Sequence, residues 1–474
     1  MLTTRALRPP VEPPKSVPVL PIPVRKIATV ASAFASQPAV TESSESQNPL
    51  RKLAFYASLG FLFLRITTLS ELLLYYLHIN FYLLYLFAPL AILGTITTGG
   101  LGRAFAQRAS GYWLAFFVWM VLATPFSSWK GDSLALIMSY GRVQLPMLFV
   151  IGGLAMNWKE IRLIFYTMAV SAMVNLATVQ LFARVDNGSR ITLDASGNLG
   201  NSNDLGAHLL LVMPYILFII LDKARSAFLR IALLPVLGYG VVVVLGTGSR
   251  GCMIAIAAIF LFALWRATPG QRVATLAVGA IFAATIPFVL PGSVMDRLST
   301  LFKEDPTNTE AAQSSAQREY LLKQSLVYTV QHPIFGVGPG QFPNYEGRMS
   351  LEEGKHGAWK VTHNFLTQIS SENGIPGLLF MLLGVSSALL LVDRTYRHAR
   401  KNGFIEIANA CYCFTLGMVG YLGSVIFLAQ AYHLYLPTMI GLAISMSTIA
   451  MRYMSSGPAR NAAVLPAPWL RASS

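Results

Sequence analysis

The chain has 474 residues, of which 54% are hydrophobic and 12% are charged, and its net charge at pH 7 is +15. Soluble domains carry roughly 25% charged residues, so this composition argues against a soluble protein and predicts an all-α, polytopic membrane protein. The positive charge does not indicate nucleic-acid binding, because the basic residues lie in short gaps between apolar runs, where they set the orientation of membrane helices.

The three cysteines, Cys252, Cys411 and Cys413, all lie in apolar runs. They offer neither a disulfide framework nor a zinc site, so packing is their expected role.

Residues 1–52 are expected to form a disordered cytoplasmic tail. They are rich in Pro, Ser, Ala and Val, and the pairs Pro9-Pro10 and Pro13-Pro14 argue against a helix. No apolar stretch with a cleavage site follows, so a signal peptide is not expected.

Twelve apolar stretches of about membrane-spanning length come next. They lie at residues 54–77, 81–98, 111–127, 133–154, 161–183, 205–221, 229–247, 251–265, 273–290, 375–392, 404–428 and 434–452. The predicted domain plan is therefore helices 1–9 at residues 53–290, a large loop at 291–374, helices 10–12 at 375–453 and a second tail at 454–474.

The short connections between these stretches differ in charge. Thirteen basic residues lie in the five connections on the side of the N-terminal tail, against three (Lys130, Arg190 and Arg250) on the other side. Since basic residues concentrate in cytoplasmic loops, both tails are predicted to be cytoplasmic and the loop 291–374 periplasmic.

The large loop carries signals of internal order, and it is long for a connection without structure of its own. Residues 314–331 have the pattern of an amphipathic helix, with Ser314 or Ser315 as its cap. Residues 332–342 hold three glycines and two prolines. They predict a structured turn, and the helix must end near His332.

Three arginines are predicted to lie on the outer face among turn-forming, hydrogen-bonding residues. Arg190 precedes a polar loop that leads into a span, which Asn203 or Asp204 would cap; Arg250 lies in a short connection; Arg318 lies on the loop helix. Each arginine also has a purely structural interpretation. The loop after Arg190 could simply be capped and solvated, Arg250 could reach lipid headgroups, and Arg318 could be a plain surface charge.

His363 stands where the polar loop meets an apolar run of about 15 residues. Taken alone it is often only an interfacial residue, but here positive charges converge on the same side of the membrane. The acidic pairs Glu304/Asp305 and Glu352/Glu353 do not form a metal cluster, so neither a metal nor a cofactor is expected. Arginines without a metal suit a substrate that carries its own negative charge, such as a pyrophosphate. A histidine of near-neutral pKa suits removal of a proton from a hydroxyl.

The stretch from His363 to Gly377 resembles the signature of the O-antigen ligase and O-antigen polymerase (Wzy/WaaL-type) family. His363-Asn364, nine residues and then Gly374-Ile375-Pro376-Gly377 fit the ligases' pattern of His, then Asn, Ser or Gln, nine residues and Gly-x-x-Gly. Residues 198–205, 249–251 and 318–338 resemble further blocks of the family, in the family's order.

The resemblance implies a metal-independent, inverting glycosyltransferase with a GT-C-type fold in the bacterial inner membrane. The implied donor is a glycan on undecaprenyl pyrophosphate, and the implied acceptor is a hydroxyl of lipid A-core or another saccharide at the periplasmic face.

Carried over by position, Arg250 and Arg318 would hold the pyrophosphate, and His363 would orient or deprotonate the acceptor hydroxyl. Glu372 would hold His363, act as a base itself, or cap the helix near Gly374. The candidate substrate-binding residues are Arg190, Asn203, Asn364, Glu372 and Gly338.

Two alternatives stay open. A polymerase or a protein O-oligosaccharyltransferase of the same family would differ only in its acceptor. A transporter is suggested by Arg65, Glu71 and Arg142, which lie inside predicted spans. Arg65 and Glu71 are six residues apart and are not expected to share a helix face. Each is expected to face the bundle interior or an internal cavity. No repeated pair of broken helices supports transport, and the other polar residues gather on one face of the membrane.

Overall fold

The computed structural model describes residues 46–67, 69–79, 82–185, 190–193, 199, 201–289, 292, 295, 309–354 and 359–462. Contacts divide the chain into Met1–Gln47 and Asn48–Ser474, and the description below concerns the second unit. Most of the predicted N-terminal tail and the C-terminal tail from residue 463 lie outside the described residues.

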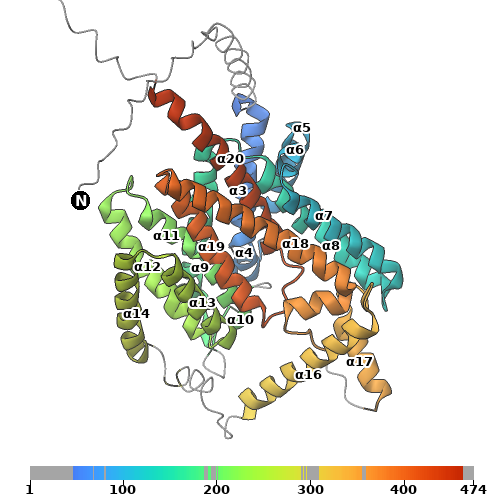
Figure 1. The fold of residues 1–474 in the computed structure, drawn as a ribbon. Helices are drawn as coiled ribbons and strands as arrows, with labels where there is room; N and C mark the ends of the chain where they lie inside the picture. Colours follow the sequence, from blue (N-terminus) through green and yellow to red (C-terminus); the bar gives the residue numbers. More distant parts are fainter. Residues whose placement is uncertain are drawn as a thin grey trace, which may run out of the picture. The chain divides into compact units, whose positions relative to one another are not determined.

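Helices form almost all of the described secondary structure (Figure 1). They are α3 (Pro49–Ile66), α4 (Leu69–Leu77), α5 (Leu83–Thr97), α6 (Gly100–Ala104), α7 (Arg108–Ala123), η1 (Thr124–Phe126), α8 (Lys130–Gly153), α9 (Trp158–Phe182), α10 (Ser202–Val212), α11 (Pro214–Leu221), α12 (Ala227–Gly246), α13 (Arg250–Arg266), α14 (Pro269–Val289), α16 (Thr309–Gln331), α17 (Phe342–Glu352), α18 (Phe365–Lys401), α19 (Ile405–Val425) and α20 (Tyr435–Ala462). The short strands β1 (Arg184–Val185) and β2 (Ile191–Thr192) pair antiparallel, with Arg184 opposite Thr192.

Helix is present at each of the twelve apolar stretches predicted from the sequence. Within the described residues, seven helical segments are long and apolar enough to cross a membrane: α7 with η1, α8, α9, α10 with α11, α12, α18 and α19. The pair α3 and α4 is an eighth candidate if its 62° bend lies within one span. The all-α membrane architecture is therefore confirmed, while the number twelve stays a prediction.

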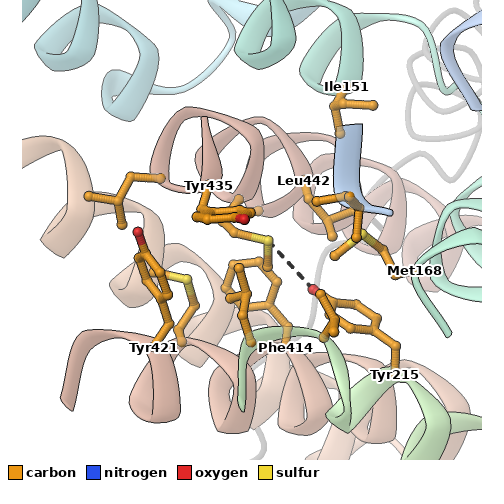
Figure 2. Close-up of a cluster of buried hydrophobic side chains, with 14 of the residues drawn as sticks. Ile151, Met168, Tyr215, Phe414, Tyr421, Tyr435 and Leu442 are labelled. Atoms are coloured by element: carbon orange, nitrogen blue, oxygen red, sulfur yellow. Dashed lines mark hydrogen bonds between the residues drawn. The ribbon is translucent and has the colours of Figure 1, made fainter. Parts of the chain in front are cut away.

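The core between the helices is rich in aromatic rings and sulfur. Figure 2 shows Tyr215 of α11, Phe414 of α19 and Tyr435 of α20 packed together, and the Tyr215 hydroxyl lies 3.8 Å from the sulfur of Met439. Glycine lets two helices approach here, since a Cβ on Gly417 would lie 2.5 Å from a backbone oxygen of α10. Small residues at such contacts allow the close backbone packing that membrane helices use.

Two predicted helix caps are wrong. The N-cap of α10 is Asn201, whose side chain accepts a 2.9 Å hydrogen bond from the Asn203 amide, so Asn203 and Asp204 lie inside the first turn. Asn201 has the same capping chemistry and comes earlier in the chain. Helix α16 begins at Thr309, because good helix formers extend it upstream of Ser314 and Ser315. It ends at Gln331, as expected.

Arg65 and Glu71 lie on either side of a bend between two helices. Helix α3 ends at Ile66 and α4 begins at Leu69 after the bend. Both charged side chains line one cavity of about 190 Å³. The two residues therefore lie on different helices and share no helix face, and both face an internal cavity, which was one of the two environments expected for them.

Candidate functional site

Helix α18 is broken at Gly374, whose φ of 69° and ψ of −177° are not helical. The residues before the break are polar and buried, whereas the apolar span begins after it. Pro376 has no amide hydrogen, so the carbonyl of Glu372 loses its helical donor at this point. The break at Gly374 likewise takes the Ile375 amide away from the Ser371 carbonyl.

The turn at residues 332–342 supplies partners for these backbone groups. Val337 N donates to Ser371 O at 2.8 Å, and Gly338 N donates to Glu372 O at 3.1 Å. The Ile375 amide donates in turn to Pro333 O at 2.8 Å. Buried backbone groups must be paired, so the two motifs that were conspicuous in the sequence form one structural unit.

Two glycines make this contact possible. Gly336 and Gly374 have φ of 68° and 69°, a region that favours glycine. A Cβ on Gly374 would lie 2.0 Å from Ile334 O, and one on Gly336 would lie 2.3 Å from the Glu372 carbonyl carbon. Glycine at position 374, in the Gly-x-Pro-Gly sequence, is thus needed for the turn at residues 332–342 to pack against α18.

The side chain of Glu372 binds backbone amides of the turn at residues 332–342. It is 2% exposed. Its Oε2 accepts hydrogen bonds from Gly340 N at 3.1 Å and from the Tyr432 hydroxyl at 2.6 Å. Its Oε1 accepts from Phe342 N at 3.3 Å, at the start of α17. The carboxylate therefore caps α17, and of the roles expected for it the structure shows neither a bond to His363 nor a cap near Gly374.

Gly338 and Asn364 also serve the local backbone. A Cβ on Gly338 would lie 2.0 Å from the hydroxyl of Ser127, so the position is tightly enclosed. Asn364 is the N-cap of α18, and its Oδ1 accepts from Leu366 N at 3.0 Å and Thr367 N at 3.1 Å. The side chain of Asn364 thereby fixes the start of the helix directly after His363.

His363 itself is half-buried, and its backbone lies in the left-handed region with φ of 52°. Such a conformation is strained for a residue with a side chain and is often kept at functional sites. The imidazole has no hydrogen-bond partner in the part of the chain that the structure describes.

Two cations lie near this histidine. Burial, then the charge of Arg318 and then that of Lys360 lower the pKa of His363 to about 4. Lys360 is tied to α16, because its Nζ donates to Gln317 Oε1 at 2.8 Å, one residue before Arg318. We call His363, Arg318 and Lys360 the histidine cluster. Lys360 was not singled out from the sequence, although it is a basic residue only three positions before His363.

A second group of residues lies around the turn between α12 and α13. Arg190 Nε donates to Thr247 O at 2.9 Å, and its Nη2 donates to Asn203 Oδ1 at 2.8 Å. Arg250 is the first residue of α13, directly after the N-cap Ser249. We call Arg190, Asn203 and Arg250 the arginine cluster. The starts of α10 and α13 meet here, and helix N-termini favour anions.

The segment Ile426–Leu434 between α19 and α20 joins the start of α10, which carries Asn203, to the first half of α18. Gln430 Nε2 donates to Asp204 Oδ1 at 2.6 Å, beside the arginine cluster. On its other side, the Ala431 amide donates to Gln368 Oε1 at 3.2 Å, and Tyr432 reaches Glu372. This segment was not predicted to belong to the site, although Gln430-Ala-Tyr-His433 is a polar interruption between two apolar runs.

The described residues include no group of three or more His, Cys, Asp or Glu placed to hold a metal ion. What the site offers is a neutral imidazole next to two cations, with two further arginines at converging helix starts.

Comparison with known families identifies the central part of the chain. Residues 235–382 match the family model described as O-antigen ligase (Wzy_C). The match confirms the resemblance seen in the sequence, and it includes Arg250, Arg318 and His363. Arg190 and Asn203 precede it. The matched region supports a membrane enzyme of the ligase or polymerase type. No curated protein matches the chain.

Proposed function

We propose that the protein is a GT-C-type glycosyltransferase of the bacterial inner membrane. It transfers a glycan from undecaprenyl pyrophosphate to a hydroxyl of lipid A-core or of another saccharide, at the periplasmic face. The observation that carries this proposal is the histidine cluster within the matched O-antigen ligase region. Its imidazole has no hydrogen-bond partner among the described residues and lies near the charges of Arg318 and Lys360.

The reaction requires a base and a stabilised leaving group. The acceptor oxygen attacks the anomeric carbon from the side opposite the pyrophosphate, the bond from carbon to phosphate oxygen breaks, and the configuration inverts. The hydroxyl proton passes to a base, and lipid pyrophosphate departs with the bonding electrons. Because the pKa of His363 is lowered to about 4, the ring is neutral at pH 7 and can accept a hydrogen bond or a proton.

The donor would also change this pKa. A pyrophosphate bound near Arg318 and Lys360 opposes their charge, so the pKa of His363 rises when the donor is present. The base is thus strengthened in the complex that reacts. The same two cations would stabilise the negative charge that develops on the leaving group, which preorganised cations do effectively.

The arginine cluster would extend the anion site. Arg250 lies at the start of α13, and Arg190 is fixed by two hydrogen bonds beside it. Asn203, to which Arg190 donates, lies on α10, and the segment Ile426–Leu434 ties α10 to the first half of α18. Several arginines in one region bind a ligand with two phosphates more tightly than one arginine would.

A polymerase or a protein O-oligosaccharyltransferase would use the same chemistry with another acceptor. We keep both as alternatives, since the acceptor surface is not defined by the clusters. Transport is the less favoured alternative, with the cavity between Arg65 and Glu71 as its only structural support among the described residues.

The test is transfer by the purified protein from undecaprenyl-pyrophosphate-linked glycan to lipid A-core, with EDTA present. His363→Ala, Arg318→Ala and Arg250→Ala should each abolish transfer while the size-exclusion profile stays unchanged. His398→Ala and Arg394→Ala are matched controls, because both residues are exposed and lie toward the end of α18, at the other end of this helix from His363. Longer glycan on the carrier, without transfer to core, would indicate a polymerase. Full activity of His363→Ala would overturn the proposed site.

A further inference from the structure

A second polar cavity lies at the end of α18 that is opposite His363. Its volume is about 300 Å³, and residues of α11, α13, α14, α18 and α19 line it. The polar lining includes Arg266, Gln271, Arg400 and Asn409, while Leu217 and Leu221 form part of the apolar wall. The proposed glycosyl transfer uses none of these residues.

Arg266 is held rigidly at this cavity. Its guanidinium carbon lies 4.6 Å from the ring centre of Trp265, 4.8 Å from that of Tyr396 and 5.5 Å from that of Phe262. Its Nη2 donates to Asp393. Its Nε, in contrast, is buried and has no hydrogen-bond partner in the described part of the chain. A buried donor without a partner is costly, and an acceptor oxygen in the cavity would satisfy it.

The charge around the cavity is positive. Asp393 is shared between Arg266 and Arg397, whose Nη2 donates to it at 2.9 Å. Arg400 lines the cavity, is exposed and has no carboxylate partner among the described residues. Three arginines against one carboxylate favour an anionic occupant.

The position of the cavity indicates where that anion comes from. Helix α13 ends at Arg266 and α14 begins at Pro269, so the cavity opens where the apolar helices end. Next to it, Trp265 and Val273 are 67% and 69% exposed. Exposed tryptophan followed by arginine at the end of an apolar helix is typical of the interface between lipid and water. A ligand here has its charged group in the cavity and its apolar part along α13 and α14.

We propose that this cavity binds the phosphate headgroup of an anionic phospholipid from the surrounding leaflet. The Arg266 and Arg400 guanidinium groups hold the phosphate oxygens, and Gln271 and Asn409 donate to the remaining oxygens of the headgroup. Basic pockets between helix ends on one side of a membrane protein are suited to such headgroups. The site is independent of the proposed glycosyl transfer.

The experiment measures lipid binding to the full chain by native mass spectrometry, after titration with phosphatidylglycerol or with phosphatidylcholine. Phosphatidylglycerol should bind more tightly, and Arg400→Gln should weaken it by about fivefold, as expected for one arginine near a lipid phosphate. Ala263→Leu fills the cavity without changing its charge, and it should weaken binding as well. Arg394→Gln is the matched control, because Arg394 is exposed on the same helix end but does not line the cavity.

Three results would overturn the proposal. Equal binding of the two lipids would exclude recognition of the anionic headgroup. An equal loss of phosphatidylglycerol binding in Arg394→Gln and Arg400→Gln would mean that general surface charge, and not the cavity, attracts the lipid. In a separate thermal-unfolding measurement, stabilisation by inorganic phosphate equal to that by phosphatidylglycerol would assign the site to a soluble anion.

Discussion

The hydroxyl of Tyr432 donates a 2.6 Å hydrogen bond to Glu372, and both side chains are buried. The same hydroxyl accepts from Asn373 Nδ2 at 2.7 Å. Tyr432 belongs to the segment between α19 and α20, and Glu372 belongs to the first half of α18. This one contact fixes the segment between α19 and α20 to the kink of α18, against which the turn at residues 332–342 packs.

Removing that hydroxyl tests how far the kink depends on it. Tyr432→Phe leaves a buried carboxylate oxygen without its shortest partner, so we expect a loss of about 1–3 kcal/mol in the free energy of unfolding. Chemical unfolding in detergent measures this loss. Tyr56→Phe is the control, because Tyr56 is 61% exposed and should be neutral. Equal stability of the two variants would show that Glu372 is satisfied without Tyr432.

The fall of kcat/KM at low pH should report the protonation of His363. In the free enzyme its pKa is lowered to about 4, so kcat/KM should stay constant from pH 7 down to about pH 5 and then fall as the ring is protonated. Lys360→Gln removes one of the cations that oppose protonation, which should move this fall to higher pH. Lys323→Gln, an exposed residue on the same helix as Arg318, should leave the fall in place. A fall near pH 6.5 in the wild type would contradict the assignment.

The same shift has a consequence for stability. Between about pH 4 and 6.5 the unfolded chain binds a proton at His363 that the folded chain does not bind. The free energy of unfolding should therefore fall as the pH is lowered through this window. His363→Gln should remove this part of the pH dependence in thermal unfolding. An unchanged slope would mean that other groups produce it.

Gly374 and Gly403 form a matched pair for the backbone break. Both have positive φ, 69° and 76°, but a Cβ on Gly374 would meet Ile334 O at 2.0 Å, whereas nothing lies within 4 Å of one on Gly403. Gly403→Ala should cost about 1 kcal/mol from the backbone alone. Gly374→Ala should cost clearly more and should also reduce transfer, because the turn must move. Equal costs in chemical unfolding would show that the turn is not seated as described.

Arg190 can be tested with lysine, which keeps the charge but not the planar fork. The two hydrogen bonds of Arg190 leave from Nε and Nη2 in different directions. Arg190→Lys should therefore lower the unfolding temperature almost as much as Arg190→Ala. If charge is what matters for the donor, Arg190→Lys should keep a lower KM for the lipid-linked glycan than Arg190→Ala. Identical KM values would limit Arg190 to a structural role.

The sequence predicted those features that depend on neighbours along the chain. Apolar runs of sufficient length became helices at all twelve stretches, because burial of a helix in lipid depends on local composition. The glycines and prolines between His332 and Phe342 ended α16 and formed a turn, since these residues restrict the backbone wherever they occur. The match of residues 235–382 to the O-antigen ligase family was also foreseen, from the spacing of His363 and the Gly-x-Pro-Gly turn.

Only the tertiary structure decided which polar groups meet. Glu372 caps α17 and not its own helix, and Gln430 reaches Asp204 across 226 positions of sequence. The bend after Ile66 lets Arg65 and Glu71, on two different helices, line the same cavity, which their spacing alone did not predict. A side chain bonds to whichever partner the packed helices bring within about 3 Å, and no periodicity or composition records that distance.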